Sequence, residues 1–229
     1  LFILTILLFL KVGSIIAYDP SSVITRVNIT RSQAIVNSVV INSGNYINLS
    51  EGTVFSVLCN ASITNYAGLH DLNQVNATFY RTNISINGAA DNNSRYKISN
   101  CSYNYTISTD TYAFYCFFNV SYHAFNGSWN CTVIVNNTLN SPTNGTNSSE
   151  IVPLFAINVT DVVDYGNMAV FDTSSVRSVN VTNFGNMPLN ISVYGYGGTS
   201  NTTRGGFAFV CPVSNISIDN QRWTLAGDV

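Results

Sequence analysis

Apolar and polar residues alternate along much of the chain with the two-residue period of β-strands. This alternation, together with β-branched and aromatic residues, predicts strands at 23–29, 53–63, 75–80, 96–107, 112–122 and 129–135. Clusters of turn-forming residues lie between them, for example at 42–45 and 87–88. No stretch after residue 17 has the period of an amphipathic helix. The pattern therefore predicts an all-β fold built as a β-sandwich.

The pattern also predicts two tandem domains. Residues 136–150 are rich in Ser, Thr, Asn, Gly and Pro and lack apolar periodicity, so we expect a linker there between a β-sandwich at 18–135 and a second one at 151–229. Strands of the second domain are predicted at 154–159, 176–181, 189–194, 206–211 and 215–218. Residues 181–189 are expected to form a hairpin that turns at 184–186. We expect the second domain to be truncated at its C-terminus, because no closing strand follows.

The first 17 residues indicate a route to the cell exterior. An apolar run at 1–10 precedes Lys11 and a stretch of small and apolar residues that ends at Ala17. This order is typical of a secretory signal peptide cleaved after Ala17, and a retained N-terminal anchor is the alternative. No Met precedes Leu1, so we expect the chain to be truncated at its start. The predicted location is extracellular, at the cell surface.

Charge contributes little to this chain. Charged residues make up 9% of the sequence and the net charge is -2, against about a quarter charged residues in ordinary soluble domains. Lys and Arg are too few and too scattered to follow a phosphate backbone, so we expect no nucleic-acid partner. Asn, Ser and Thr, with any attached sugar, must instead keep the surface soluble.

Asn-x-Ser/Thr triplets, the acceptors of N-linked glycans, are the most frequent motif. An Asn-rich composition produces some of them by chance, but the signal peptide would place the chain where such sites are modified. We therefore predict N-linked glycans on many of them. The acceptor asparagines are Asn28, Asn48, Asn60, Asn76, Asn83, Asn92, Asn100, Asn104, Asn119, Asn126, Asn130, Asn136, Asn144, Asn147, Asn158, Asn180, Asn190, Asn201 and Asn215.

Several triplets have an apolar middle residue. In a strand, residues i and i+2 share a face, so Asn and Ser/Thr would face solvent while the middle residue faces the core. These triplets are therefore predicted to mark half-buried strands. The middle residues are Ile29, Leu49, Ile84, Val120, Val159, Val181, Ile191 and Ile216.

The chain has five cysteines, which in a secreted protein indicate disulfides. Cys59, Cys101, Cys116 and Cys131 lie in the first domain, and four cysteines allow three pairings. We predict that Cys59 pairs with Cys131, as an early and a late strand are joined across the two sheets of a sandwich. Cys101 would then pair with Cys116 across a hairpin that turns near 108–110. Cys211 is left unpaired, with its partner expected downstream of Val229 or in another chain.

One motif resembles a known family. Residues 127–131, Gly-Ser-Trp-Asn-Cys, are similar to the G-x-Y/W-x-C stretch that begins the second cysteine strand of immunoglobulin-like (Ig-like) domains. The order of further segments resembles large secreted Ig-like proteins of small-genome archaea of the DPANN group. The resemblance implies a surface location and tandem Ig-like β-sandwiches, but no particular activity. These segments are 75–80, 91–93, Cys101, Cys116, 127–133, 164–167, 179–186 and 190–197.

Candidate chemistry is sparse. Asp71, Asp91 and Asn92 lack the spaced series of ligands of a calcium loop, so a solvated turn is the favoured interpretation. CxxC pairs are absent and His70 and His123 are the only histidines, so neither a metal nor a cofactor is expected. Paired carboxylates could flank a glycosidic bond, but we interpret the available ones as loop residues. Those carboxylates are Asp161, Asp164 and Asp172.

The aromatic residues of the hairpin allow two interpretations. They can form a binding face or can pack one sheet through cross-strand pairs, and packing is favoured. These residues are Tyr103, Tyr105, Tyr112, Tyr115, Phe117 and Phe118.

The sequence as a whole predicts a non-enzymatic, N-glycosylated structural or adhesive protein of the cell surface, such as an envelope coat, a filament subunit or an attachment module. Its partners would be copies of itself or another cell-surface protein, and a membrane only if the N-terminal segment is retained. The alternative is a secreted carbohydrate-active enzyme or a carbohydrate-binding module.

Overall fold

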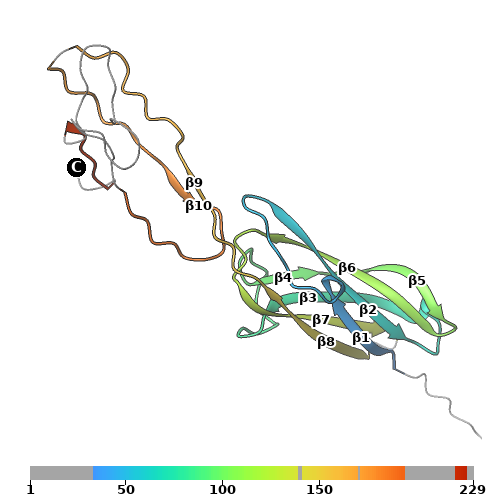
Figure 1. The fold of residues 1–229 in the computed structure, drawn as a ribbon. Coiled ribbons are helices and arrows are strands. Elements are labelled where there is room, and N and C mark those ends of the chain that lie inside the picture. Colours follow the sequence, from blue (N-terminus) through green and yellow to red (C-terminus); the bar gives the residue numbers. More distant parts are fainter. Residues whose placement is uncertain (1–32, 139–140, 170, 194–219, 226–229) are drawn as a thin grey trace, which may run out of the picture.

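The computed structural model describes residues 33–138, 141–169, 171–193 and 220–225 (Figure 1). Its regular elements are strands, apart from two short 3₁₀ turns, η1 at Asn42–Gly44 and η2 at Leu69–Asp71. The all-β prediction is thus confirmed. The strands are β1 (Ile35–Ile41), β2 (Val54–Thr64), β3 (Leu72–Arg81), β4 (Arg95–Ile98), β5 (Ser102–Ser108), β6 (Thr111–Ser121), β7 (Gly127–Asn137), β8 (Pro142–Ile151), β9 (Ile157–Val159) and β10 (Val181–Asn183).

The first eight strands form two four-stranded antiparallel sheets. One sheet has the order β1-β2-β6-β5 and is called the β2–β6 sheet below. The other has the order β4-β3-β7-β8 and is called the β3–β7 sheet. Their inner faces meet in one core, so residues 33–152 make a β-sandwich.

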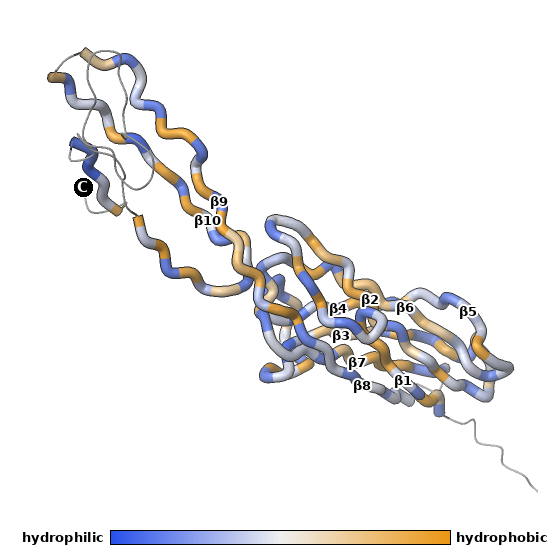
Figure 2. Tube along the Cα trace, in the orientation of Figure 1, coloured by the Kyte–Doolittle hydropathy of each residue, from blue (hydrophilic) through white to orange (hydrophobic). Residues whose placement is uncertain are grey.

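Alternation along the central strands builds this core. In β2, Val57, Cys59, Ala61 and Ile63 are completely buried, and the residues between them are only partly covered. Figure 2 shows the corresponding alternation of hydrophobic and hydrophilic residues along the sandwich. A strand with one apolar face is stable only where that face is covered, and here the second sheet covers it.

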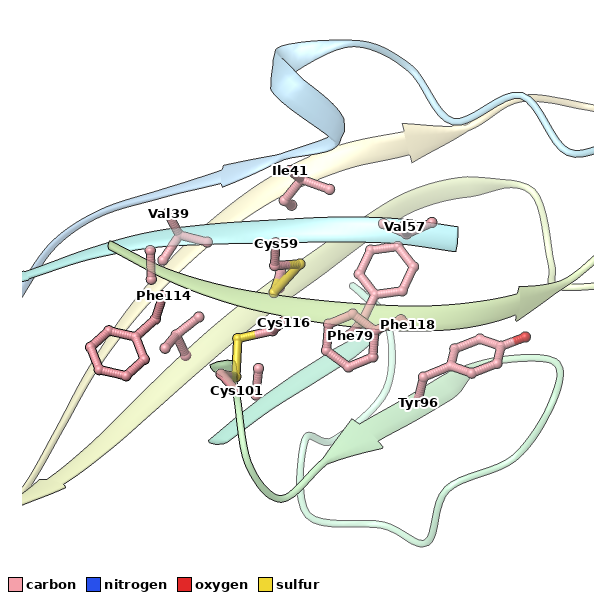
Figure 3. Packing of buried hydrophobic residues seen from close by; sticks show 14 of the residues in the cluster. Val39, Ile41, Val57, Cys59, Phe79, Tyr96, Cys101, Phe114, Cys116 and Phe118 are labelled. Carbon is pink, nitrogen blue, oxygen red and sulfur yellow. A yellow bond between two sulfur atoms is a disulfide. The ribbon is translucent and has the colours of Figure 1, made fainter. Parts of the chain in front are cut away.

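Four aromatic rings fill the end of the core near β4. Phe79 of β3 stacks on Trp129 of β7, with ring centroids 4.8 Å apart, and also contacts Phe118 of β6 at 5.7 Å. Tyr96 of β4 closes the group 6.0 Å from Trp129. Figure 3 shows Phe79, Phe118 and Tyr96 converging from different strands. The indole N–H of Trp129 donates to the carbonyl of Phe125 at 2.8 Å, so this buried polar group is satisfied.

Two disulfides join the strands in the predicted pairings (Figure 3). Cys59 of β2 bonds Cys131 of β7 and so links the two sheets, with the Cα atoms 6.6 Å apart. Cys101 immediately precedes β5 and bonds Cys116 of β6 across the β5–β6 hairpin, whose turn lies at residues 109 and 110.

The strand predicted at 96–107 is in fact two strands in different sheets. β4 pairs with β3, whereas β5 pairs with β6. The chain crosses between the sheets at 99–101, where the N–H of Cys101 donates to the carbonyl of Val75 at 2.7 Å. Both halves carry strand-forming residues, so composition alone does not reveal where the chain changes sheets.

The linker predicted at 136–150 is wrong, because these residues complete β7 and form β8. β8 pairs with β7 from Gly127↔Ile151 to Asn136↔Pro142. Only Ile151 of this strand is buried, so the apolar pattern that identifies a strand is missing. Pro142 stands at the first position of an edge strand, where its lack of an N–H is tolerated.

β1 and β8 lie side by side and close one long side of the sandwich. Side chains of β8 donate to backbone carbonyls of the N-terminal segment: Thr143 to Ala34 at 2.8 Å and Asn147 to Val39 at 2.7 Å. Backbone hydrogen bonds then follow, from the N–H of Ile47 to the carbonyl of Glu150 and from the N–H of Val152 to the carbonyl of Ile47. This parallel contact begins after η1 turns the chain away from β2.

After Ile151 the described chain contains little regular structure. β9 and β10 pair antiparallel; β9 lies within the strand predicted at 154–159, whereas β10 overlaps the one predicted at 176–181 only at Val181. No strand forms at 189–193, and the predicted strands at 23–29, 206–211 and 215–218 lie outside the described residues. Large apolar side chains recur along this part and are exposed, for example Phe155, Val162 and Ile191 (Figure 2).

The turn at 184–186 is present but does not form the predicted 181–189 hairpin. Instead it docks on the chain just after β8. The Asn186 side chain accepts from the N–H of Leu154 at 2.7 Å and donates to the carbonyl of Val152 at 3.1 Å. The Phe184 ring packs edge-on against Tyr122 of the sandwich, with centroids 5.6 Å apart.

Gly185 makes this docking possible, and replacing it should abolish it. A Cβ atom there would lie 2.1 Å from the carbonyl oxygen of Leu154, and this backbone atom cannot move aside. We expect Gly185→Ala to release the turn, which would increase amide hydrogen exchange at Phe184 and Asn186 at least about tenfold. The control Met187→Leu should leave exchange unchanged. Normal protection in Gly185→Ala would show that the docking tolerates a side chain.

Candidate functional site

All of the acceptor asparagines that the structure describes lie outside the buried core. Each described acceptor is exposed or half-buried, and none is buried. The buried asparagines among the described residues are Asn65, Asn137 and Asn186, and none of these begins an Asn-x-Ser/Thr triplet. The fold therefore keeps the described acceptors outside the core. Asn28, Asn201 and Asn215 lie outside the described residues.

The apolar middle residues of the Asn-x-Ser/Thr triplets are expected to face the core from half-buried strands, and this expectation holds only in part. Val120 in β6 is fully buried between an exposed Asn119 and a half-buried Ser121, and Leu49 is buried between exposed neighbours. Val159, Val181 and Ile191 are instead exposed. Ile84 lies half-buried in a turn and Leu49 lies between strands, so among the described triplets only that of Val120 marks a half-buried strand. Ile29 and Ile216 lie outside the described residues.

The outer face of the β3–β7 sheet combines a row of polar residues with the side chains of Tyr80 and Ile134. Register aligns Lys97, Thr78, Thr132 and Thr146 across its four strands, and the Thr132 and Thr146 hydroxyls are 2.7 Å apart. A shallow hollow covers this row, and its lining includes no Asp, Glu, His or Cys. The hollow therefore lacks the paired carboxylates that glycoside hydrolysis needs. Acceptors on this face are Asn76, Asn130, Asn136 and Asn144.

The aromatic residues of the β5–β6 hairpin divide between core and surface. Tyr112 and Phe118 are buried, as the packing interpretation expects. Tyr103, Tyr105 and Phe117 are 44–51% exposed. The Tyr115 and Phe117 rings make an edge-on contact on the outer face of the β2–β6 sheet, with centroids 6.0 Å apart. The hairpin thus packs the core and also presents rings to solvent.

Asp71 is buried, which corrects the solvated turn expected for it. The Thr138 hydroxyl donates to its carboxylate, and the N–H of Thr138 donates to its backbone carbonyl at 2.9 Å. The side-chain amide of Asn65 also donates to the carboxylate, at 3.4 Å. Asp71 therefore holds the 65–71 turn against the end of β7. Sequence reasoning missed this role because its partner, Thr138, is distant in the sequence.

The other candidate carboxylates serve local turns. Asp164 accepts from the N–H of Gly166 and Asp172 from the N–H of Ala169, at 2.8 and 2.9 Å. Asp161 is exposed. Across the residues that the structure describes, no group of three or more His, Cys, Asp or Glu side chains could hold a metal ion.

Arg95 organises the loop between β3 and β4. Its buried guanidinium donates to the carbonyls of Ala89 and Ser85. It lies across Gly88, where a Cβ atom would approach the guanidinium to 2.0 Å. The same loop contains Asp91, which accepts from the N–H of Asn93 at 2.8 Å and from the N–H and hydroxyl of Ser94.

These contacts set the pKa of Asp91. Partial burial raises it, but the hydrogen bonds from Ser94 and Asn93 outweigh burial, so the pKa lies below the ordinary value. For Tyr96 at the base of the loop, burial raises the pKa of the phenol, although the N–H of Ser121 donates to it.

Asp91 should make the loop sensitive to acid. A carboxyl whose folded pKa is depressed contributes stability that is complete above the unfolded pKa, about 3.9, and is lost as the pH falls through the folded value. We expect Asp91→Asn, which keeps the acceptor oxygen, to flatten the decline of the melting temperature below about pH 4 relative to the wild type. Glu51→Gln is the control, and an unchanged pH profile in Asp91→Asn would contradict the assignment.

The signal peptide predicted at 1–17 and the unpaired Cys211 lie outside the described residues. Within the described ranges, no helix has the length and apolar character needed to span a bilayer. The two disulfides are compatible with an extracellular location. No protein-family model, curated protein or solved structure matches the chain.

Proposed function

We propose that residues 33–152 form an Ig-like domain of a secreted, N-glycosylated surface protein with a structural or adhesive role. The strand order supports the Ig-like assignment, since β1-β2-β6-β5 and β4-β3-β7-β8 follow the ABED and C′CFG order of that fold. The disulfide between β2 and β7 corresponds to its inter-sheet B–F bond.

Trp129 adds a second line of support. Many immunoglobulin domains place a tyrosine two residues before the second cysteine, and its hydroxyl bonds a backbone group a few residues upstream. Trp129 stands two residues before Cys131 and donates to the carbonyl of Phe125 in the same way. The chain departs from the family on the third strand, where Phe79 faces the core and packs on this indole in place of the usual tryptophan.

The accessible acceptors are the single observation that carries the glycoprotein assignment. The described acceptors are exposed or half-buried, many of them on the outer faces of the two sheets, while the buried asparagines lack the triplet. Glycopeptide mass spectrometry of the secreted protein tests this directly. Sugar on several acceptors is the expected result, and unmodified asparagine throughout would overturn the proposal.

A structural role needs chain-to-chain contacts, and β5 offers one route. Among the described strands it pairs only with β6, and all seven of its residues are exposed. An open strand edge can accept a strand of another copy. Imaging native cell-surface material at side-chain resolution would reveal a regular lattice or filament for this role. Solitary molecules with one sugar-free face would favour an adhesin instead.

The alternative of a secreted carbohydrate-active enzyme gains no support from the described residues. The hollow on the β3–β7 sheet has no carboxylate in its lining, Asp164 and Asp172 accept within their own turns, and Asp161 is exposed. A second β unit, beginning with β9 and β10, would continue the tandem arrangement that the resemblance to archaeal Ig-like surface proteins implies.

A further inference from the structure

The outer face of the β2–β6 sheet carries an apolar patch at its centre, called the aromatic face below. It consists of Val40 of β1, Leu58 of β2, and Tyr115 and Phe117 of β6. Leu58 lies directly opposite Phe117, and these side chains point away from the core because Cys59 and Cys116 between them point inward. Phe117 is 51% exposed and Val40 38% exposed, so nothing in the described chain covers the patch fully.

Two glycan acceptors stand within this face. Asn60 is the cross-strand partner of both Val40 and Tyr115. Asn119 follows Phe117 by two residues on β6, which puts both side chains on the same face about 7 Å apart. The serines of the two triplets, Ser62 and Ser121, also alternate with buried residues and thus share the outward face.

We propose that the N-linked glycans of Asn60 and Asn119 fold back onto the aromatic face and cover the rings of Tyr115 and Phe117. This proposal rests on the proposed N-glycosylation and adds where two of the glycans lie. One face of a pyranose ring presents C–H groups, which pack against aromatic rings much as apolar side chains do. Sugars attached to Asn60 approach Tyr115 from the neighbouring strand, and sugars attached to Asn119 approach Phe117 along the same strand.

The position of the acceptors favours glycans over a protein partner as the cover. A protein that docked flat on this sheet would have to displace two glycans rooted among the contact residues. An exposed apolar patch of this kind would otherwise promote association, and the attached sugars remove it from water.

Thermal unfolding of the secreted, glycosylated protein tests the proposal. The double variant Asn60→Gln/Asn119→Gln removes both glycans, and Asn83→Gln removes one from an exposed turn as the control. We expect the double variant to melt at least about 4 °C lower and the control to be unchanged. In a Tyr115→Ser/Phe117→Ser background, the same removal of the two glycans should lower the melting temperature much less, because the glycans there have no rings to cover.

A second measurement uses only the wild-type protein, so it does not require any variant to fold. In NMR spectra of the wild-type protein carrying ¹³C-labelled glycans, ring currents should shift protons of the first sugars at Asn60 and Asn119 upfield, and those at Asn83 should keep ordinary shifts. The inference would be overturned if Asn60 and Asn119 carried glycans whose protons had ordinary chemical shifts, and if removing the glycans lowered the melting temperature equally with and without the two rings. Empty sites at 60 and 119 with sugar elsewhere would also overturn it but leave the proposed function intact. No sugar on any acceptor would defeat both.

Discussion

Replacing Trp129 by alanine is expected to lower the free energy of unfolding by about 3–5 kcal/mol, the range for deleting a large buried aromatic side chain. The indole is fully buried, stacks on Phe79 and lies between the two sheets. The substitution leaves a cavity and also leaves the carbonyl of Phe125 without its donor. Urea denaturation with circular dichroism measures the loss.

The chain supplies its own control for this experiment. Trp223, the only other tryptophan, is 67% exposed, so Trp223→Ala should change the unfolding free energy by less than about 0.5 kcal/mol. Trp129→Phe should retain much of the stacking and lose mainly the N–H donor, at a cost of about 1–3 kcal/mol. Equal effects of the two tryptophan-to-alanine changes would show that Trp129 is not part of the core.

The two disulfides should contribute unequally to stability. The sequence separations of 72 and 15 residues give about 4.4 kcal/mol for Cys59–Cys131 and about 3.0 kcal/mol for Cys101–Cys116 when the loop-entropy relation is applied. We therefore expect Cys59→Ala/Cys131→Ala to destabilise the domain by about 1.4 kcal/mol more than Cys101→Ala/Cys116→Ala. All four cysteines are buried, so the lost sulfur packing is similar in both variants.

Urea titrations of the two double variants at equal protein concentration measure this difference. The triplets at Asn60, Asn100 and Asn130 survive these changes, since no cysteine is an acceptor or a hydroxyl residue of a triplet. A larger loss from the hairpin disulfide than from the inter-sheet disulfide would contradict the expectation. It would mean that the β5–β6 hairpin, and not the union of the sheets, limits the stability of the domain.

The sequence predicts those parts of the fold that alternate between core and solvent. β2, β3, β6 and β7 have one apolar face each, and their predicted ranges agree with the structure within a few residues. The cysteine pairing follows from the same strands, because Cys59 and Cys131 must both face inward for the sheets to be joined. The turn predicted near 108–110 follows as well, since β5 ends at Ser108 and β6 begins at Thr111.

The parts that were missed depend on backbone pairing or on distant partners. β8 holds its place through its backbone ladder with β7 and polar side chains, so the string Thr-Asn-Gly-Thr-Asn-Ser-Ser looks like a linker. β1 contains an irregularity between Val36 and Ser38 that interrupts its alternation. The outward-facing Tyr115 and Phe117 could not be separated from the buried Phe118 until register assigned each to a face.

The close contact of β1 with β8 determines how the domain would carry a mechanical load. The two strands run parallel, with Ala34 beside Thr143, Val39 beside Asn147 and Ile47 beside Glu150. Tension applied between residue 33 and residue 152 would therefore act along the strands and load these hydrogen bonds together, in shear. Antiparallel terminal strands would instead open one bond at a time, like a zipper. A surface protein built from such domains would resist being pulled apart along its length, because forced unfolding must break the hydrogen bonds between the β1 and β8 segments together.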